Sequence, residues 1–283
     1  MWRPWCIAKT STESRMSIIN SGKFIAASVA LFLLAGCATP PPADDPDAVA
    51  EFQQINDPLE PMNRGIFDFN QKLYDYGLTP AAKAYRYVVP QWGRDRVADI
   101  LNNLKSPVTL INDLLQGNFT RGGVTVVRFV LNSTFGVAGI MDVATPMGIP
   151  GHPADAGETL AVWGMGEGFY LVLPLFGPSN PRDGIGLGAD SFMDPLSWYL
   201  NDNHMRWVST GRFLVNGLSA YEAHMDQFAD VKRSSLDYYS AMRSLYRQYR
   251  DAQIEDAKSG HWAPIDPNKQ QPSPDLDPNK QQQ

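Results

Sequence analysis

Apolar residues recur at three- and four-residue steps along much of this 283-residue chain, and that spacing predicts a mainly helical protein. The first predicted helix follows Asp57-Pro58-Leu59-Glu60, in which Asp57 is placed to cap the helix and Pro58 to occupy its first turn. Pro61 removes an amide, so a start nearer Asn63 stays open. We expect Gly77 to end this helix. Its apolar positions are Met62, Ile66, Phe69, Leu73 and Tyr76.

Ser/Thr-Pro pairs predict further helix starts close behind the first. Thr79-Pro80 begins a helix that should end at Val89, before Pro90. A second helix is expected from Gly93 to Lys105, and Ser106-Pro107 should begin a third that ends before Gly117. This punctuation predicts short helices joined by short connections.

Two later segments are ambiguous. Thr120 to Gly136 has the β-branched composition of a strand but lacks strict alternation, and Thr120 also fits as the cap of a buried helix. Phe169 to Phe176 is wholly apolar, but Pro174 would deny a strand one ladder hydrogen bond, so we expect a single extended segment among helices. Helices are then predicted at 181–193, 196–200 and 207–230, and from Ser234 or Ser235 to Lys258.

The segment from Thr145 to Pro153 is a loop rich in glycine and proline that also carries large apolar residues. We expect it to expose Met147 and Ile149, beside Pro146 and Pro150. Since loops are usually polar, these four residues predict contact with lipid or with a partner protein. The alternative is a loop folded over its own core.

Three arginines, Arg243, Arg247 and Arg250, share one stripe of the last predicted helix. A solvated basic face is the simpler interpretation of this stripe. The alternative is a contact site for lipid phosphate or for an acidic partner.

The N-terminal region reads as an export signal. The apolar run from Phe24 to Gly36 has 13 residues, whereas a membrane span needs about 20, so it fits the core of a signal peptide better. It ends in Leu33-Leu34-Ala35-Gly36-Cys37, which resembles a bacterial lipobox. We therefore expect a signal peptide at 1–36, with translation starting at Met16 as an option, and a covalent lipid on Cys37. Residues 37–55 should form a flexible tether, and 259–283 a disordered tail.

Composition narrows the chemistry of the mature chain. Cys6 lies in the leader and Cys37 carries lipid, so no thiol remains for a disulfide or a metal. From Cys37 onward, 20 Lys and Arg face 29 Asp and Glu, and a net charge of −9 argues against nucleic-acid binding. The four histidines do not have the spacing of a metal site.

Catalytic signatures are missing from the sequence. It contains no G-x-S-x-G, H-E-x-x-H or C-x-x-C motif and no phosphate-binding G-x-x-x-x-G-K. The Gly184-x-Gly186-x-Gly188 run is better explained by close helix packing than by a nucleotide loop. A Ser-His-Asp triad built from distant positions with His152, His204 or His224 stays open, because geometry defines such a triad. We predict a protein that is not an enzyme and needs no cofactor.

Several motifs, taken in order, resemble those of the VacJ/MlaA family of outer-membrane lipoproteins. The resemblance covers roughly Asp57 to Asp230. The matching stretches are Asn56 to Arg64 with Phe67, Phe69 and Asn70, then Leu115-Gln116-Gly117, Arg128 to Gly136, Gly157-Glu158-Thr159-Leu160, and Leu173-Pro174 to Arg182-Asp183.

The resemblance implies an all-α fold: a single ring-shaped helical domain (56–258) of short amphipathic helices embedded in one membrane leaflet. It also implies a lipid transporter with an amphipathic pore, which takes mislocalised phospholipids from the outer leaflet of the outer membrane. Its implied partners are an MlaC-like periplasmic lipid carrier and a trimeric porin, with the protein on the periplasmic side of that membrane. On this view the 145–153 loop is expected to gate the pore.

Two other classes remain as alternatives. A structural or adhesive surface lipoprotein would carry the same anchor but no transport path. A periplasmic phospholipase would release lysophospholipid. The sequence does not assign the residues that would line a pore.

Overall fold

The protein is mainly helical, and the predicted all-α class is confirmed. The computed structural model describes residues 57–260. The predicted signal peptide, the lipidated Cys37, the tether and the tail beyond Gly260 lie outside the described residues. The chain divides into two compact units, Met1–Gly65 and Ile66–Gln283, and each is described by itself below.

The described part of the first unit holds the start of helix α3 (Glu60–Leu73). Asn63 is fully buried, and its side-chain amide donates a 2.8 Å hydrogen bond to the buried carboxylate of Asp57. Arg64 bonds Glu60 one turn away at 2.8 Å. The helix thus begins at Glu60, between the two starts that the sequence left open.

In the second unit Gly77 does not end the first helix, as the sequence had suggested. The chain passes through a π-helical turn, η1 (Tyr74–Leu78), directly into α4 (Thr79–Val88). The Thr79 amide donates to the Tyr74 carbonyl five residues back, so the helix is widened immediately before Pro80. A wider turn relieves the clash that a proline ring makes with the preceding turn.

The two helices that the sequence predicted before and after Ser106-Pro107 form one continuous helix. Helix α5 (Gln91–Leu115) runs through Pro107, where the sequence predicted a break. A proline inside a helix costs roughly 3 kcal/mol. The residues after Pro107 are among the most buried of α5, including Asn112 and Asp113, and α5 contacts four other α-helices of the second unit besides α6. This packing compensates for the proline.

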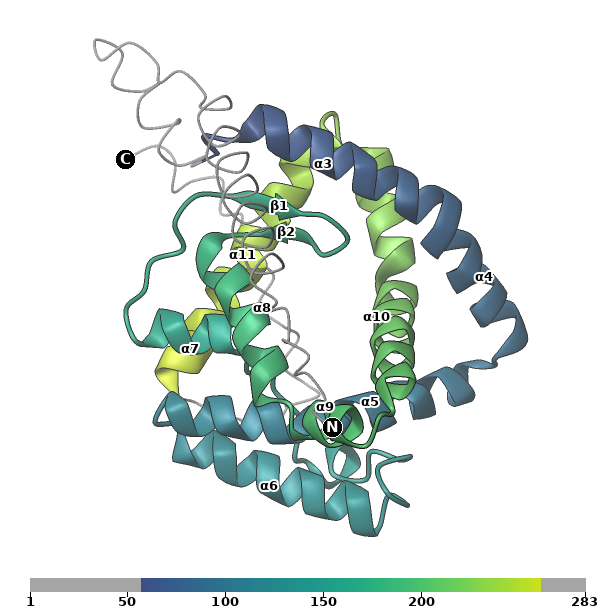
Figure 1. Ribbon diagram of the computed structural model, residues 1–283, viewed down its shortest axis with the longest axis vertical. Coiled ribbons are helices and arrows are strands. Elements are labelled where there is room, and N and C mark those ends of the chain that lie inside the picture. The colour runs from purple at the N-terminus through teal and green to yellow at the C-terminus, as the bar shows by residue number, and fades with distance from the viewer. Residues whose placement is uncertain (1–56, 261–283) are drawn as a thin grey trace, which may run out of the picture. The chain divides into compact units, whose positions relative to one another are not determined.

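The first ambiguous segment is helical. Helix α6 (Phe119–Thr134) is capped by Asn118, whose side chain accepts a hydrogen bond from the Arg121 amide, rather than by Thr120. Helices α5 and α6 lie side by side (Figure 1). A 3₁₀ turn, η2 (Thr145–Met147), and the short helix α7 (Ala156–Val162) follow.

The second ambiguous segment is half of a hairpin and not a single extended strand. Strand β1 (Leu171–Leu173) pairs antiparallel with β2 (Gly177–Ser179), with Val172 opposite Pro178. Pro174 falls in the turn beyond the ladder, where no hydrogen bond is required of it. Asn70 holds this turn, since its amide donates to the Leu173 carbonyl and accepts from the Leu175 amide, both at 2.9 Å.

Four helices complete the described chain, and each lies close to its predicted range. They are α8 (Pro181–Met193), α9 (Pro195–Asp202), α10 (Arg206–Ser234) and α11 (Tyr238–Ser259). The cap of α11 is Asp237, not Ser234 or Ser235. Helix α5 has 25 residues in place of two predicted short helices, whereas α10 and α11, with 29 and 22 residues, were already expected to be long. Within residues 57–260, no helix combines the length and the apolar content needed to cross a bilayer.

Helix contacts in the second unit form a closed circuit. Helix α10 touches α11, α11 touches α7, α7 touches α8, α8 touches α5, and α5 touches α10, with α9 between α5 and α10 (Figure 1). A small apolar core of Phe67, Tyr170, Val172 and Tyr239 fastens the hairpin to α3 and α11. Gly186 allows α8 to approach α7, because a Cβ at this position would lie 2.3 Å from the Gly157 amide nitrogen. Close helix packing thus explains Gly186, whereas a Cβ at Gly188 would meet no atom within 4 Å.

Candidate functional site

An amphipathic cavity of about 270 Å³ lies among α5, α8, α9 and α10. Its apolar lining comes from Leu101, Leu104, Val108, Leu187 and Phe213. Its polar lining comes from Lys105, Asp190, Ser191, Asp194, Ser197, Ser209, Arg212 and Asn216. Leu101, Leu104, Lys105 and Val108 follow one another at helical spacing, so one face of α5 supplies both kinds of surface.

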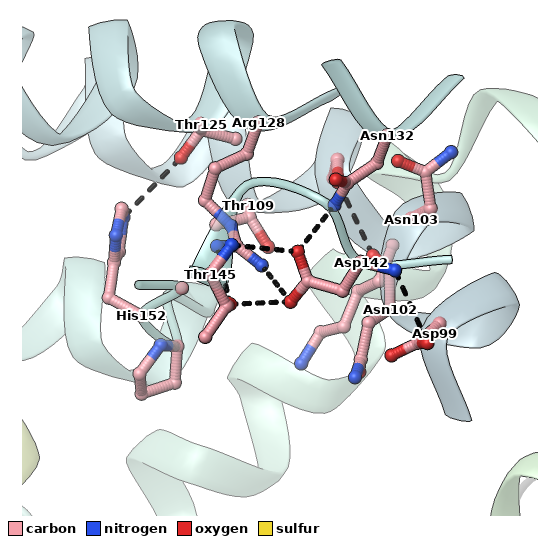
Figure 2. A pocket seen from close by; sticks show the side chains of 14 residues that line it. Asp99, Asn102, Asn103, Thr109, Thr125, Arg128, Asn132, Asp142, Thr145 and His152 are labelled. Carbon is pink, nitrogen blue, oxygen red and sulfur yellow. Dashed lines mark hydrogen bonds and ion pairs between the residues drawn. The ribbon is translucent and has the colours of Figure 1, made fainter. Parts of the chain in front are cut away.

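A second, polar cavity of about 410 Å³ lies between α5, α6 and the segment from Asp142 to Pro153 (Figure 2). Its side chains are mostly amides, hydroxyls and charged groups. They come from Asp99, Asn102, Asn103, Lys105, Ser106, Thr109, Thr125, Arg128, Asn132, Asp142, Thr145, His152 and Pro153, with Gly151.

Lys105 lines both cavities. Its side chain is exposed, and it makes no hydrogen bond or ion pair with another residue of the described chain. Arg128 and Arg212, the other cations of the two cavities, are paired with Asp142 and Asp194. Lys105 is therefore the cation of these cavities that has no hydrogen-bonded partner, although its charge also acts on the carboxylates of Asp155, Glu158 and Asp190.

Asp142 organises the polar cavity (Figure 2). Its carboxylate accepts hydrogen bonds from Arg128 at 2.8 Å, from the Thr145 hydroxyl at 2.6 Å and from the Asn132 amide at 3.1 Å. Burial acts to raise the pKa of Asp142, but the bonds from Thr145 and Arg128 outweigh it and lower the pKa to about 2. Arg128 also bonds the Ile149 carbonyl, so the same network holds the loop.

The four residues of the 145–153 loop that were predicted to contact lipid or a partner differ in their exposure to solvent. Pro146 is exposed and Met147 is 63% exposed, as the sequence predicted for Met147. Ile149 is only half-buried at the surface and Pro150 is buried, so the expectation that Ile149 would be exposed like Met147 was wrong. The reason is local, since the Ile149 amide and carbonyl are both bonded, to Ala144 and to Arg128.

The histidines do not form a catalytic triad in the part of the chain that the structure describes. His152 Nε2 lies 3.0 Å from the buried carboxylate of Asp113, which also accepts a 2.7 Å bond from the Thr125 hydroxyl. The Thr125 hydroxyl also lies 3.4 Å from His152 Nε2, but it donates its shorter bond, of 2.7 Å, to Asp113 and not to the imidazole, as a nucleophile would to its base. His224 bonds the Ala220 carbonyl of its own helix.

Arg250 is buried, which neither interpretation of the arginine stripe anticipated. Its guanidinium makes two bonds to Asp155 (2.6 and 2.7 Å), two to Asp183 (2.8 and 3.2 Å) and one to Glu158 (3.3 Å). These carboxylates belong to the start of α7 and the start of α8. Arg250 is therefore an internal tie between α11, α7 and α8, and it presents no charge to a partner.

The other two arginines of the stripe are partly exposed. Arg247 bonds Glu167 at 2.7 Å, and Arg243 lies over the Tyr239 ring at 5.5 Å. Periodicity placed the three arginines on one stripe but did not distinguish the one that faces inward.

The pKa values of the carboxylates around Arg250 are shifted in opposite directions. Burial would raise the pKa values of Asp155 and Asp183, but their hydrogen bonds from Arg250 hold them below the usual range. Glu158 is fully buried and one of its oxygens has no hydrogen-bond partner. Burial, helped by the negative charge of Asp155, raises the pKa of Glu158 to about 7.

Large apolar side chains cover much of the described surface. On α6 and the turn after it, Phe119, Val126, Val127, Val130, Phe135 and Val137 are exposed. Trp92, Trp163, Trp198, Tyr199 and Trp207 are exposed on other elements. Large exposed apolar side chains mark surfaces that contact a membrane or a partner, and exposed tryptophan and tyrosine are typical of membrane interfaces.

The site therefore combines polar and apolar walls with one available cation. Among the described residues, no group of His, Asp and Glu side chains has the arrangement of a metal site. Sequence reasoning missed Lys105, Asp142 and Arg212. The heptad-like run from Leu101 to Val108, with a lysine inside its apolar stripe, was the available signal for Lys105.

The fold and the cavities define a mainly helical protein built around an amphipathic cavity. A family model described as MlaA lipoprotein matches residues 55–253, and the chain belongs to this family. Membership identifies it as an outer-membrane lipoprotein, as the sequence motifs indicated.

Curated relatives and a solved structure agree with this family assignment. The intermembrane phospholipid transport system lipoprotein MlaA of Escherichia coli is 34% identical over 224 residues, 77% of this chain and 83% of the relative. The protein of the same name in Haemophilus influenzae is 34% identical over 233 residues, 80% of this chain and 87% of the relative. A solved structure described as "Structural basis for maintenance of bacterial outer membrane lipid asymmetry" has a TM-score of 0.62 and 34% identity, and the match covers 70% of this chain and 98% of that one.

Replacement of Arg250 is expected to destabilise the fold strongly. Arg250→Ala leaves the buried Glu158 and the partly buried Asp155 and Asp183 without their common cation, and breaking a buried pair costs roughly 3–5 kcal/mol. Arg247→Ala is the matched control, because a partly exposed pair contributes about 0–1 kcal/mol. Denaturant unfolding of both variants in detergent measures the difference. Equal losses would contradict the role of Arg250 as an internal tie.

Glu158 is expected to make stability depend on pH. Its pKa is about 7 in the folded protein against an ordinary value of 4.5, so the stabilisation present below pH 4.5 is lost as the pH rises through 7. Glu158→Gln removes this loss. The variant should gain thermal stability relative to the parent protein between pH 5 and pH 8. A difference in melting temperature that does not change with pH would contradict the raised pKa.

Proposed function

We propose that this lipoprotein removes mislocalised phospholipids from the outer leaflet of the outer membrane and so maintains lipid asymmetry. The observation that carries the proposal is the amphipathic cavity, whose apolar wall suits acyl chains and whose polar wall suits a headgroup. The names of the relatives, which refer to phospholipid transport between membranes, support the same assignment.

Lys105 is the residue that we expect to meet the headgroup. Every phospholipid carries a phosphate, and an exposed ammonium that no carboxylate hydrogen-bonds is a suitable group to bind it. Because Lys105 lines both cavities, a headgroup bound there would contact the polar cavity while its chains remain against Leu101, Leu104 and Val108. The two cavities together then form the path of the lipid.

The outer surface supports a location in the membrane leaflet. Helices that lie in a leaflet bury apolar faces in the acyl region without spanning it, and their backbone hydrogen bonds are satisfied internally. The exposed side chains of α6 suit that environment. We infer that a lipid on Cys37 adds an anchor, that the protein faces the periplasm, and that it passes lipid to an MlaC-like periplasmic carrier beside a trimeric porin.

Filling the amphipathic cavity should block lipid removal. Ser191 is exposed and lines the cavity from α8, so Ser191→Trp places an indole there without disturbing a buried side chain. Cells that carry this variant in place of the parent protein should accumulate outer-leaflet phosphatidylethanolamine, measured with an amine-reactive label that does not cross the membrane. Ser244→Trp on the exposed side of α11 is the control.

An outer leaflet free of phospholipid in the Ser191→Trp strain, with the variant present at normal levels, would contradict transport through this cavity. Fragile cells with normal lipid distribution after deletion of the gene would favour the structural lipoprotein. Release of lysophospholipid by the purified protein would favour a phospholipase.

We also propose that the 145–153 loop, with Pro146, Met147, Ile149 and Pro150, opens the polar cavity. The bonds of Arg128 to Thr145 and Asp142 hold the loop in the structure described above, and His152 lies beside Thr125, 3.4 Å from its hydroxyl. Movement of the loop requires these contacts to break.

Cysteines at Thr125 and His152 test this movement. Joining the two thiols with a bis-methanethiosulfonate cross-linker should stop lipid removal, and a reductant, which cleaves the linker from both cysteines, should restore it in the same preparation. The measurement is transfer of labelled phospholipid from vesicles that contain the purified double variant. Equal transfer by the cross-linked and the reduced protein would show that the loop need not move.

A further inference from the structure

A third cavity, of about 300 Å³, lies among α3, η1, α4, β2, α10 and α11. We call it the aromatic cavity. It shares no lining residue with the two cavities described above, and the transport route proposed here does not use it. It belongs entirely to the second unit.

The floor of the aromatic cavity is apolar. Phe67 and Met225 are buried there, and Tyr74 and Tyr221 stand with their ring centroids 5.7 Å apart. The tyrosine hydroxyls are already engaged, that of Tyr221 with Thr79 at 2.7 Å and that of Tyr74 with the Leu175 carbonyl at 3.2 Å. Such a floor accepts hydrocarbon and gives no polar group to a ligand.

Methionine makes this floor adaptable. Met225 on α10 and Met242 on α11 both line the cavity. Unbranched thioether side chains repack easily around flexible apolar ligands. The cavity is also bounded by the π-helical turn η1, a distortion that often occurs at functional sites.

Charged groups stand at the exposed mouth. Lys232 is paired with Asp75 at 3.0 Å, and both side chains are about half exposed. Asp226 is paired with Arg86 at 2.8 Å. Lys83 is exposed and has no hydrogen bond or ion pair with another described residue. After these pairings, Lys83 is an uncompensated positive charge at the mouth.

We propose that the aromatic cavity binds a free long-chain fatty acid, with its acyl chain on the floor and its carboxylate on Lys83. The single apolar cavity suits one acyl chain, and the single uncompensated cation at its mouth suits one negatively charged carboxylate. A quaternary ammonium group fits less well, because the Lys232 ammonium already lies 6.0 Å above the Tyr238 ring. The volume of the aromatic cavity, about 300 Å³, is at the lower end of the range for ligand cavities, and a lipid with two acyl chains is too large for it.

A photoreactive palmitic acid tests the proposal. It is added to the full-length lipoprotein in phosphatidylcholine vesicles, and the cross-linked peptides are mapped by mass spectrometry. We expect labelling in 67–83 and 221–242. Lys83→Glu should lower this labelling roughly tenfold, the effect of losing one charge-assisted contact. Met225→Trp should abolish it by filling the floor.

Lys72→Glu is the matched control, an exposed charge reversal on α3 outside the cavity, and it should leave labelling unchanged. Equal labelling by the methyl ester of the probe, or by the Lys83→Glu and parent proteins, would overturn the role of Lys83. Preferential labelling by a photoreactive lysophospholipid would overturn the fatty acid as the occupant. Lipid asymmetry is not measured, so failure here leaves the proposed transport function untouched.

Discussion

The pairing of Arg250 with three carboxylates is the interaction on which the helical circuit depends. Asp155 and Glu158 stand at the start of α7, and Asp183 stands at the start of α8. Acidic groups at helix N-termini are favourable, but three of them buried together would repel one another. One guanidinium from α11 bonds all three, although one Glu158 oxygen is left without a partner, and it thereby joins the helices that close the circuit.

The motifs that resemble the family are largely the parts of such buried polar locks. Asn70 holds the turn of the hairpin, Asn132 bonds Asp142 and the backbone after it, and Glu158 and Asp183 surround Arg250. A buried polar group costs free energy unless it has a partner, so each lock needs particular side chains at particular places. That requirement explains why short sequence stretches are so informative about this fold.

The distribution of polarity is partly inverted relative to a water-soluble protein. Amides, hydroxyls and ion pairs line the interior cavities, while phenylalanine, valine and tryptophan cover much of the outside. A protein whose outer surface meets lipid gains free energy from that arrangement and can keep a polar interior for a headgroup. Because this protein need not hide all of its apolar side chains from lipid, an apolar cavity such as the aromatic cavity can exist in the second unit apart from its packed core.

The sequence by itself determined the helical class, the family and most helix ranges, because apolar periodicity and capping residues are local signals. It did not determine that α5 continues through Pro107 or that η1 joins α3 to α4, since packing overrode the local preference at both places. Nor did it separate Arg250 from Arg247, or single out Lys105. Those roles depend on which distant carboxylates approach each cation, and only the tertiary structure brings such groups together.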